Sequence, residues 1–78
     1  RFPKNEYPYV ATKPWHGSQK KVDEDDTSVT IELDVVINYE LEQKILSWGD
    51  YVEVLQPQTL RDTIGHRLEN AIRNNRLK

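Results

Sequence analysis

The thirteen residues from Ile45 to Pro57 constrain the fold of this chain more than any other segment. Gly49 follows the last apolar residue of a helical pattern, where a helix end favours glycine because glycine adopts a left-handed conformation without steric cost. Residues 51–55 are strand formers with one polar position, Glu53, which predicts a short strand. Pro57 suits the first turn of a second helix, where its missing N–H loses no hydrogen bond. The segment therefore predicts a helix, a turn, a strand and a second helix, as in a small α/β sandwich.

Length and composition limit the class of protein. The chain has 78 residues, which predicts a single domain over residues 1–78. Its 11 basic and 13 acidic residues give a formal net charge of −2, so no general attraction to nucleic acid or to an anionic membrane is expected. The absence of cysteine excludes disulfides, thiolate metal sites and a cysteine nucleophile. Because no apolar run approaches the length of a membrane span and residues 1–5 do not resemble a signal peptide, we expect a soluble cytoplasmic protein without a cofactor.

Alternation of apolar and polar residues predicts a hairpin in the first half of the chain. The clearest period-two pattern covers residues 28–37 and predicts a half-buried strand. Residues 18–22 form a shorter polar run, in which Lys20 and Lys21 suit an edge strand. Residues 23–26 are acidic and predict the connecting turn. The inward-facing residues of the longer strand are expected to be Val29, Ile31, Leu33 and Val35.

Two short helices are predicted on either side of the hairpin. Residues 4–13 suit a helix if Pro8 lies in its first turn. Residues 39–48 suit a second helix, for which Asn38 is a good N-cap. The residues of the first helix expected to face inward are Val10 and Ala11. Those of the second, spaced four and three apart, are Leu41, Ile45 and Trp48.

The last helix is expected from Pro57 to about residue 75. Gly65 lies inside its apolar stripe and costs about 1 kcal/mol in helix propensity, so we expect a close packing contact there. The stripe consists of Leu60, Ile64, Leu68, Ala71 and Ile72. The order of elements is (β)αββαβα, an α+β ferredoxin-like (split βαβ) sandwich with a truncated first strand and helices on one face of an antiparallel sheet. The open face of that sheet would carry Thr30, Glu32, Asp34, Tyr51 and Glu53.

This order, together with three segments, resembles a known family. The segments are Pro14-Trp15-His16-Gly17-Ser18-Gln19, then Ile45-Leu46-Ser47-Trp48-Gly49-Asp50 with Val52-Glu53-Val54-Leu55, and Leu60-Arg61. They resemble the C-terminal extension (WCX) domain of WYL-domain bacterial transcriptional regulators, and the resemblance covers essentially the whole chain. It implies a ferredoxin-like fold and a role in dimer assembly or effector-linked switching. It also implies a homodimer through the parent regulator, upstream winged helix-turn-helix and WYL domains, and DNA contact only through the parent protein.

The chain departs from this family in two respects. It lacks the helix-turn-helix and the Trp-Tyr-Leu motif, so we do not expect it to read an operator itself. The family's first strand normally ends in something like Arg1-Phe2, so most of that central strand is missing. Without it, backbone groups of two neighbouring strands lose their partners. Either the sheet rearranges, or another chain supplies the strand, or upstream residues supply it.

The first candidate site is a polar segment around Trp15. Trp15, His16 and Gln19 stand beside Lys13 and Lys20, a set that suits an anionic or nucleotide-like effector with Trp15 as a stacking surface. The alternative is that Trp15 covers the core while the lysines solvate an edge strand. Both interpretations remain open from the sequence.

A second candidate is a protein interface at Trp48 and Tyr51, because aromatic residues are enriched at binding hot spots. Trp48 also falls on a helical stripe, which favours packing in the core. The acidic run at residues 23–26 invites a calcium interpretation, but it lacks the glycine and the distal glutamate of an EF-hand loop and better suits a solvated turn.

The sequence leaves three classes of function to compare. The first is a non-catalytic module for assembly or effector response in a transcription regulator, acting chiefly in dimerisation. The second is sensing of a small molecule, nucleotide or single-stranded nucleic acid, although the expected open sheet face is acidic and offers only Tyr51 for stacking. An enzyme is not expected, because neither histidine falls in a catalytic spacing and no phosphate-binding glycine loop is present.

Overall fold

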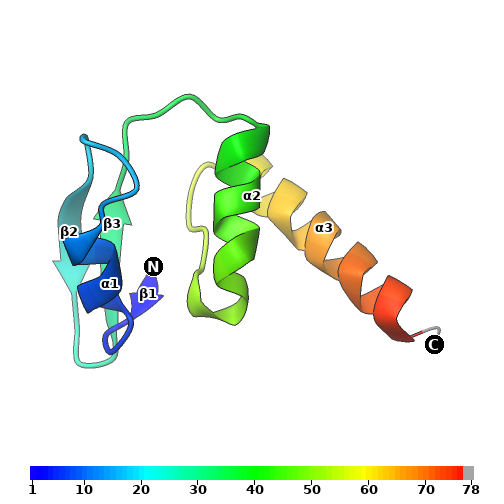
Figure 1. The fold of residues 1–78 in the computed structure, drawn as a ribbon, viewed down its shortest axis with the longest axis horizontal. Helices are drawn as coiled ribbons and strands as arrows, with labels where there is room; N and C mark the ends of the chain where they lie inside the picture. The colour runs from blue at the N-terminus through cyan, green and yellow to red at the C-terminus, as the bar shows by residue number, and fades with distance from the viewer. Residues whose placement is uncertain (77–78) are drawn as a thin grey trace. The chain divides into compact units, whose positions relative to one another are not determined.

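The computed structural model describes residues 1–76; residues 77 and 78 lie outside the description. The elements are β1 (Phe2–Pro3), α1 (Tyr7–Thr12), β2 (Lys20–Glu24), β3 (Ser28–Glu32), α2 (Tyr39–Trp48), the 3-10 helix η1 (Gly49–Tyr51) and α3 (Gln58–Arg76) (Figure 1). They divide into two compact units, which are described separately. Unit 1 comprises Arg1–Val36 with Asp50–Glu53, and unit 2 comprises Ile37–Gly49 with the described residues from Val54 onward. The expectation of one domain stays a prediction.

Unit 1 contains an antiparallel sheet whose strand order, within residues 1–76, is β1-β3-β2. Phe2 of β1 lies opposite Val29, and Lys20 of β2 lies opposite Glu32. The hairpin of β2 and β3 confirms the α+β class and the polar edge strand, since every residue of β2 is exposed. The strand is displaced by two residues from the predicted 18–22 and carries an irregularity after Lys21.

The core of unit 1 forms where α1 lies against the sheet (Figure 1). Phe2, Val10 and Val29 have exposed fractions of 2%, 0% and 1%. Trp15 packs edge-on against Phe2, with ring centroids 5.5 Å apart and planes at 83°. Full burial of such side chains contributes about 1.5–3 kcal/mol each. The prediction that Ala11 also faces inward was wrong, since Ala11 is exposed.

The first helix is shorter than the predicted 4–13. The backbone N–H of Lys4 donates to the carbonyl oxygen of Thr27, 2.9 Å away, and so extends the β1–β3 pairing instead of entering a helix. Helix α1 begins only at Tyr7, with Pro8 in its first turn as expected. Its last residue is Thr12.

The turn between β2 and β3 begins two residues later than predicted. Asp23 and Glu24 belong to β2, and the turn begins at Asp25. Its carboxylate Oδ1 accepts hydrogen bonds from the backbone N–H groups of Thr27 and Ser28, at 2.8 and 2.7 Å. These bonds stabilise the ionised form and lower the pKa of the Asp25 carboxyl from 3.8 to about 2.

Two predicted strands differ from the structure. The strand expected over residues 28–37 ends at Glu32, because the last backbone pair of the hairpin is Lys20 with Glu32. The strand expected over residues 51–55 is absent. Tyr51 belongs to η1, and residues 52–55 have no regular secondary structure. One pair of backbone hydrogen bonds remains, from Arg1 nitrogen to Glu53 oxygen at 2.7 Å and from Glu53 nitrogen to Arg1 oxygen at 2.9 Å.

Unit 2 is a helical pair. Asn38 caps α2 as predicted, its side-chain oxygen accepting the N–H of Leu41 at 2.9 Å. Gly49 ends α2 with φ +58°, which confirms the expected positive φ. Helix α3 begins at Gln58, directly after Pro57, whose carbonyl oxygen accepts the N–H of Arg61 at 3.0 Å. The buried residues of the pair are Ile45, Leu60 and Ile64.

Arg67 of α3 links this helix to α2 through polar side-chain contacts. Its Nη1 lies 3.1 Å from Glu42 Oε1, and its Nη2 donates to Gln43 Oε1 at 2.6 Å. The guanidinium carbon also lies 5.1 Å from the centroid of the Tyr39 ring. One half-buried arginine on α3 therefore binds three side chains of α2.

Only part of the apolar stripe of α3 is buried within unit 2. Leu60 and Ile64 are buried, but Ala71 is exposed, and Leu68 and Ile72 are 41% and 52% exposed. The ten residues of α2 span about 15 Å, whereas the nineteen of α3 span about 28 Å. The shorter helix therefore cannot cover the longer one.

The close contact expected at Gly65 is also absent. Apart from the two neighbouring residues and the nearby backbone of α3 itself, no heavy atom among the described residues lies within 4 Å of the position a Cβ would take there. Gly65 is a half-buried residue beside open space, and its helix-propensity cost is not offset by packing.

Candidate functional site

The predicted effector segment lies in unit 1, along the connection from α1 to β2. Lys13 is the exposed C-cap residue of α1 and Lys20 is the first residue of β2. Trp15 and Gln19 are half-buried, and His16 is exposed. The structure therefore gathers the five residues on one connection, but it turns them in different directions: two support the fold and three face solvent.

Gln19 holds this connection in shape. Its side-chain oxygen accepts the backbone N–H of Trp15 at 2.9 Å, and its side-chain nitrogen donates to the carbonyl oxygen of Val10 at 3.1 Å. The side-chain amide of Gln19 thus links α1, at Val10, to the loop that follows it, at Trp15. Together with the packing of Trp15 on Phe2, this favours the structural interpretation of these two residues.

His16 and Ser18 form a compact turn. The backbone N–H of Ser18 donates to His16 Nδ1 at 3.0 Å, and Ser18 Oγ lies 2.8 Å from the same nitrogen. Because a nitrogen that accepts an N–H carries no proton, this geometry places the proton of the neutral ring on Nε2. His16 therefore presents Nε2–H outward as its available donor.

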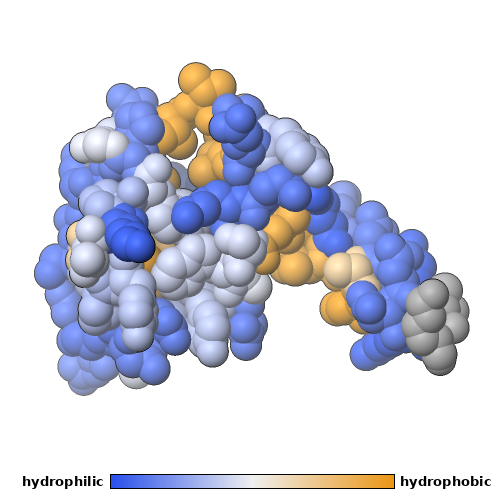
Figure 2. Space-filling view, viewed as in Figure 1, coloured by the Kyte–Doolittle hydropathy of each residue, from blue (hydrophilic) through white to orange (hydrophobic). Residues whose placement is uncertain are grey.

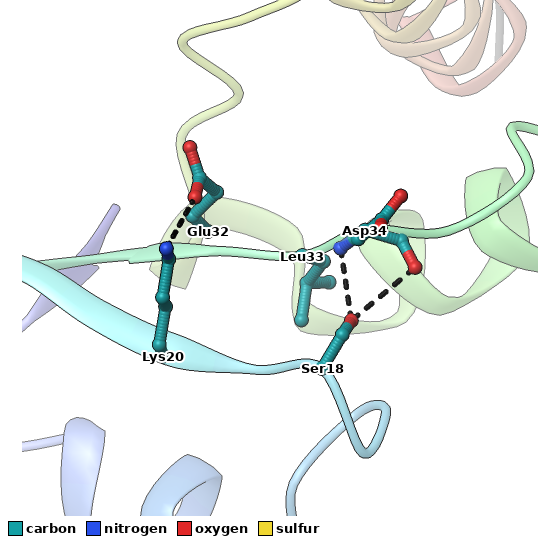
Figure 3. A pocket seen from close by; sticks show the side chains of 5 residues that line it. All are labelled: Ser18, Lys20, Glu32, Leu33 and Asp34. Carbon is teal, nitrogen blue, oxygen red and sulfur yellow. Dashed lines mark hydrogen bonds and ion pairs between the residues drawn. The ribbon is translucent and has the colours of Figure 1, made fainter.

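A shallow open hollow of about 520 Å³ lies beside this turn (Figure 3). Lys20 is the one member of the predicted effector set among its lining residues. Lys20 Nζ lies 3.3 Å from Glu32 Oε2, so its charge is paired. The lining residues are Ser18, Lys20, Glu32, Leu33 and Asp34. With two carboxyl side chains and one ammonium, this hollow has no excess of positive charge to attract an anion.

The sequence singled out Lys20 but not the rest of this hollow. Ser18 lies in one of the segments that carry the family resemblance, and Glu32 and Asp34 lie on the polar face of the alternating run. The missing information was where β3 ends, because the hollow forms at the point where the β2–β3 pairing stops at Glu32.

The two predicted interface residues lie close together in sequence. Trp48 is the last residue of α2 and is half-buried. Tyr51 ends η1 and is 47% exposed. Their role in an interface stays a prediction.

No three or more His, Cys, Asp or Glu side chains within residues 1–76 are placed to hold a metal ion. In the same part of the chain, no helix combines the length and the apolar character needed to cross a membrane.

Comparison with known proteins gives one match. The family model described as the WCX domain matches residues 1–72. Comparison with curated proteins found no significant match. Comparison with solved structures found none either.

Proposed function

The chain belongs to the WCX domain family, and from this premise we propose that it acts as the non-catalytic C-terminal extension of a WYL-type bacterial transcription regulator. The observation that carries the proposal is the match over residues 1–72, nearly the whole chain. DNA is contacted by the parent protein, through a winged helix-turn-helix upstream. The extension contributes to assembly and to the response to an effector.

The ferredoxin-like order is part of this proposal. The observed order β1-β3-β2 is three quarters of the ferredoxin-like arrangement, in which a fourth strand lies on the other side of the first. The two backbone hydrogen bonds between Arg1 and Glu53 support a fourth strand position at Glu53, within the residues 51–55 for which a strand was predicted. A residue pair that exchanges both bonds has the pattern of an antiparallel pair.

We propose that assembly means dimerisation through α3. Leu68 and Ile72 continue the spacing of Leu60 and Ile64 but are 41% and 52% exposed. Figure 2 shows apolar surface on α3. A helix face that is apolar and continuous with a packed seam is the kind of surface on which a second copy of the helix packs.

The solution mass of the chain tests this function. Size-exclusion chromatography with light scattering over a hundredfold concentration range should give a dimer, or a dimer that dissociates on dilution. The same measurement on the parent protein, with and without residues 1–78, should show dimers only when these residues are present. A parent protein that stays dimeric without them, while the chain alone is monomeric throughout, would overturn the assembly role.

A second candidate is effector sensing next to the Trp15–Gln19 segment, because a hollow lined by Ser18 and Lys20 lies beside this segment. The probes are a nucleoside monophosphate and a short single-stranded oligonucleotide, titrated by calorimetry against the chain and against Lys20→Ala. Binding that is lost in the variant supports this function, and heats indistinguishable from dilution in both proteins exclude it for these ligands.

A further inference from the structure

Helix α3 carries a second apolar face beside the one that packs on α2. At about 100° per residue, Leu68 lies about 40° further round the helix than the buried Ile64, and Ile72 about 80° further. Both lie in the part of α3 that the shorter α2 does not cover, and they are 41% and 52% exposed (Figure 1). Gly65 lies about 20° beyond Ile72. Gly65, Leu68 and Ile72 therefore share one side of the helix, here called the second face.

Gly65 leaves a recess in the second face. Apart from its two neighbours in sequence and the nearby backbone of α3, no heavy atom within residues 1–76 lies within 4 Å of the position that a Cβ would take there. Residues three and four positions apart are neighbours on a helix surface, so Leu68 and Glu69 border the recess on its C-terminal side. Helices pack by placing side chains of one between side chains of the other. A missing side chain in an exposed apolar face is therefore a place for the side chain of a partner helix.

The charges beside the second face favour one direction for such a partner. Four exposed charged residues lie within about 100° of Ile72 on the same side of α3: Asp62, Glu69, Arg73 and Arg76. The two acidic residues come first along the helix and the two basic residues last. An antiparallel copy of α3 therefore places its basic end beside the acidic end of the first copy, whereas a parallel copy places like charges together. Exposed pairs of this kind contribute little to affinity but select the orientation of a complex.

The spacing of the recess and Ile72 selects one register. Gly65 and Ile72 are seven residues apart, which is about two helical turns. A two-fold axis midway between them, next to Leu68, brings Ile72 of each copy over Gly65 of the other. The same axis brings the two Leu68 side chains close together and places Asp62 within one residue of the level of Arg76. One register therefore fills the recess, buries the exposed leucine and pairs opposite charges at both ends.

We propose that two copies of this chain associate through antiparallel α3 helices, about a two-fold axis next to Leu68, with Ile72 of each copy seated over Gly65 of the other. A two-fold contact is self-complementary, so each residue pair occurs twice. The inference rests on the proposed function in one respect, that the chain dimerises through α3. It adds the direction of the two helices, their register and a role for Gly65, whose cost in helix propensity is offset by packing in the dimer.

Chemical crosslinking tests the direction and the register. The chain has no cysteine, so a variant with a single cysteine is crosslinked by a bismaleimide only to another copy. Asp62→Cys and Arg76→Cys are treated with bismaleimidoethane separately and as an equimolar mixture, and mass spectrometry distinguishes the products. The mixed product should exceed either self-crosslinked product at least about tenfold, because the antiparallel register separates equal positions by about 20 Å along the helix axes. The mixed dimer keeps its other Asp62–Arg76 pair intact.

Filling the recess tests the role of Gly65. Gly65→Gln should weaken the dimer at least about tenfold in Kd, because its side chain occupies the place of Ile72 from the other copy. Asn70→Gln is the matched control, since Asn70 is exposed and lies on the opposite side of α3, and its Kd should stay within about twofold of the unmodified chain. At concentrations at which the chain is dissociated, Gly65→Gln should be at least as stable as the unmodified chain, because glutamine has the higher helix propensity.

The outcomes separate this inference from the proposed function. A self-crosslinked Arg76→Cys product as abundant as the mixed one would mean parallel helices or another register and would overturn the inference. Equal dissociation constants for Gly65→Gln and Asn70→Gln would overturn it too, since nothing then occupies the recess. In both cases a dimer by light scattering leaves the proposed function standing. A chain that stays monomeric at every concentration contradicts the dimerisation proposal and this inference together.

Discussion

Ser18 Oγ accepts the backbone N–H of Asp34 at 2.9 Å and lies 3.3 Å from the carbonyl oxygen of the same residue. The register that pairs Lys20 with Glu32 would place Ser18 opposite Asp34 as the next pair of the ladder. A side-chain hydroxyl thus replaces the backbone partner at the end of the hairpin. The same hydroxyl closes the turn with His16.

We expect Ser18→Ala to lower the free energy of unfolding by about 1 kcal/mol, because it leaves the backbone groups of Asp34 without this partner. Urea denaturation followed by circular dichroism measures the change. Ser47→Ala is the matched control, since the Ser47 hydroxyl only donates to the carbonyl oxygen of Lys44 within α2. If the two variants were equally stable, the hydroxyl of Ser18 would have no role in holding the end of the hairpin.

The turn at Asp25 should make stability depend on acid pH. Hydrogen bonds from the backbone of Thr27 and Ser28 lower the pKa of the Asp25 carboxyl to about 2 in the folded chain, against an ordinary value of 3.8. Between pH about 4 and pH about 2 the unfolded state therefore binds more protons than the folded state. The contribution of Asp25 is fully present above pH about 4 and is lost as the pH falls toward 2.

Asp25→Asn removes this titration but keeps an oxygen acceptor at the turn. Its unfolding free energy should therefore fall less steeply between pH 4 and pH 2 than that of the unmodified chain, as measured by urea denaturation at half-unit steps of pH. Asp26→Asn is the control, because it removes one carboxylate from the neighbouring position. A parallel pH dependence in the Asp25 variant and the unmodified chain would contradict the assignment.

Two glycines of unit 2 should respond to alanine in opposite directions. Gly65 lies within α3 beside open space, so Gly65→Ala should raise the free energy of unfolding by about 1 kcal/mol through helix propensity alone. Gly49 ends α2 with φ +58°, where a side chain is strained, so Gly49→Ala should lower it by about 1–2 kcal/mol. Thermal denaturation of the two variants measures both effects, and a loss of stability in Gly65→Ala would show that a close contact exists there after all.

The sequence predicted the helices of unit 2 more accurately than the strands of unit 1. Helix α2 has the expected bounds because its signals are local: Asn38 caps it and Gly49 ends it. The strand at residues 28–37 was predicted too long, because a strand extends only as far as it has a partner. The partner, β2, begins at Lys20, and alternation in one segment contains no information about that limit.

The candidate site shows the same limitation. The sequence grouped Trp15, His16 and Gln19 as one polar set, because they are adjacent. In the structure, the side-chain amide of Gln19 forms hydrogen bonds with backbone groups of Val10 and Trp15, and the Trp15 ring packs on Phe2. Phe2 stands thirteen residues away, so only the folded chain reveals the packing that decides the role of Trp15.

The exposed half of α3 provides the sharpest mutational test of dimerisation. Leu68→Asp and Ile72→Asp each remove an exposed apolar side chain and introduce a charge that a helix–helix interface would bury. We expect each to weaken the dimer at least about tenfold in Kd, since burial of one such apolar side chain in the interface contributes about 1–2 kcal/mol to association. Sedimentation equilibrium measures the dissociation constant.

Asn70→Asp is the matched control, because it adds the same charge to the same helix at an exposed position between these two residues and outside the apolar stripe. It should leave the dissociation constant within about twofold of the unmodified chain. Because Leu68 and Ile72 are already exposed, helical content by circular dichroism should be unchanged in all three variants. Should Leu68→Asp and Ile72→Asp associate as tightly as Asn70→Asp, the dimer does not form through α3.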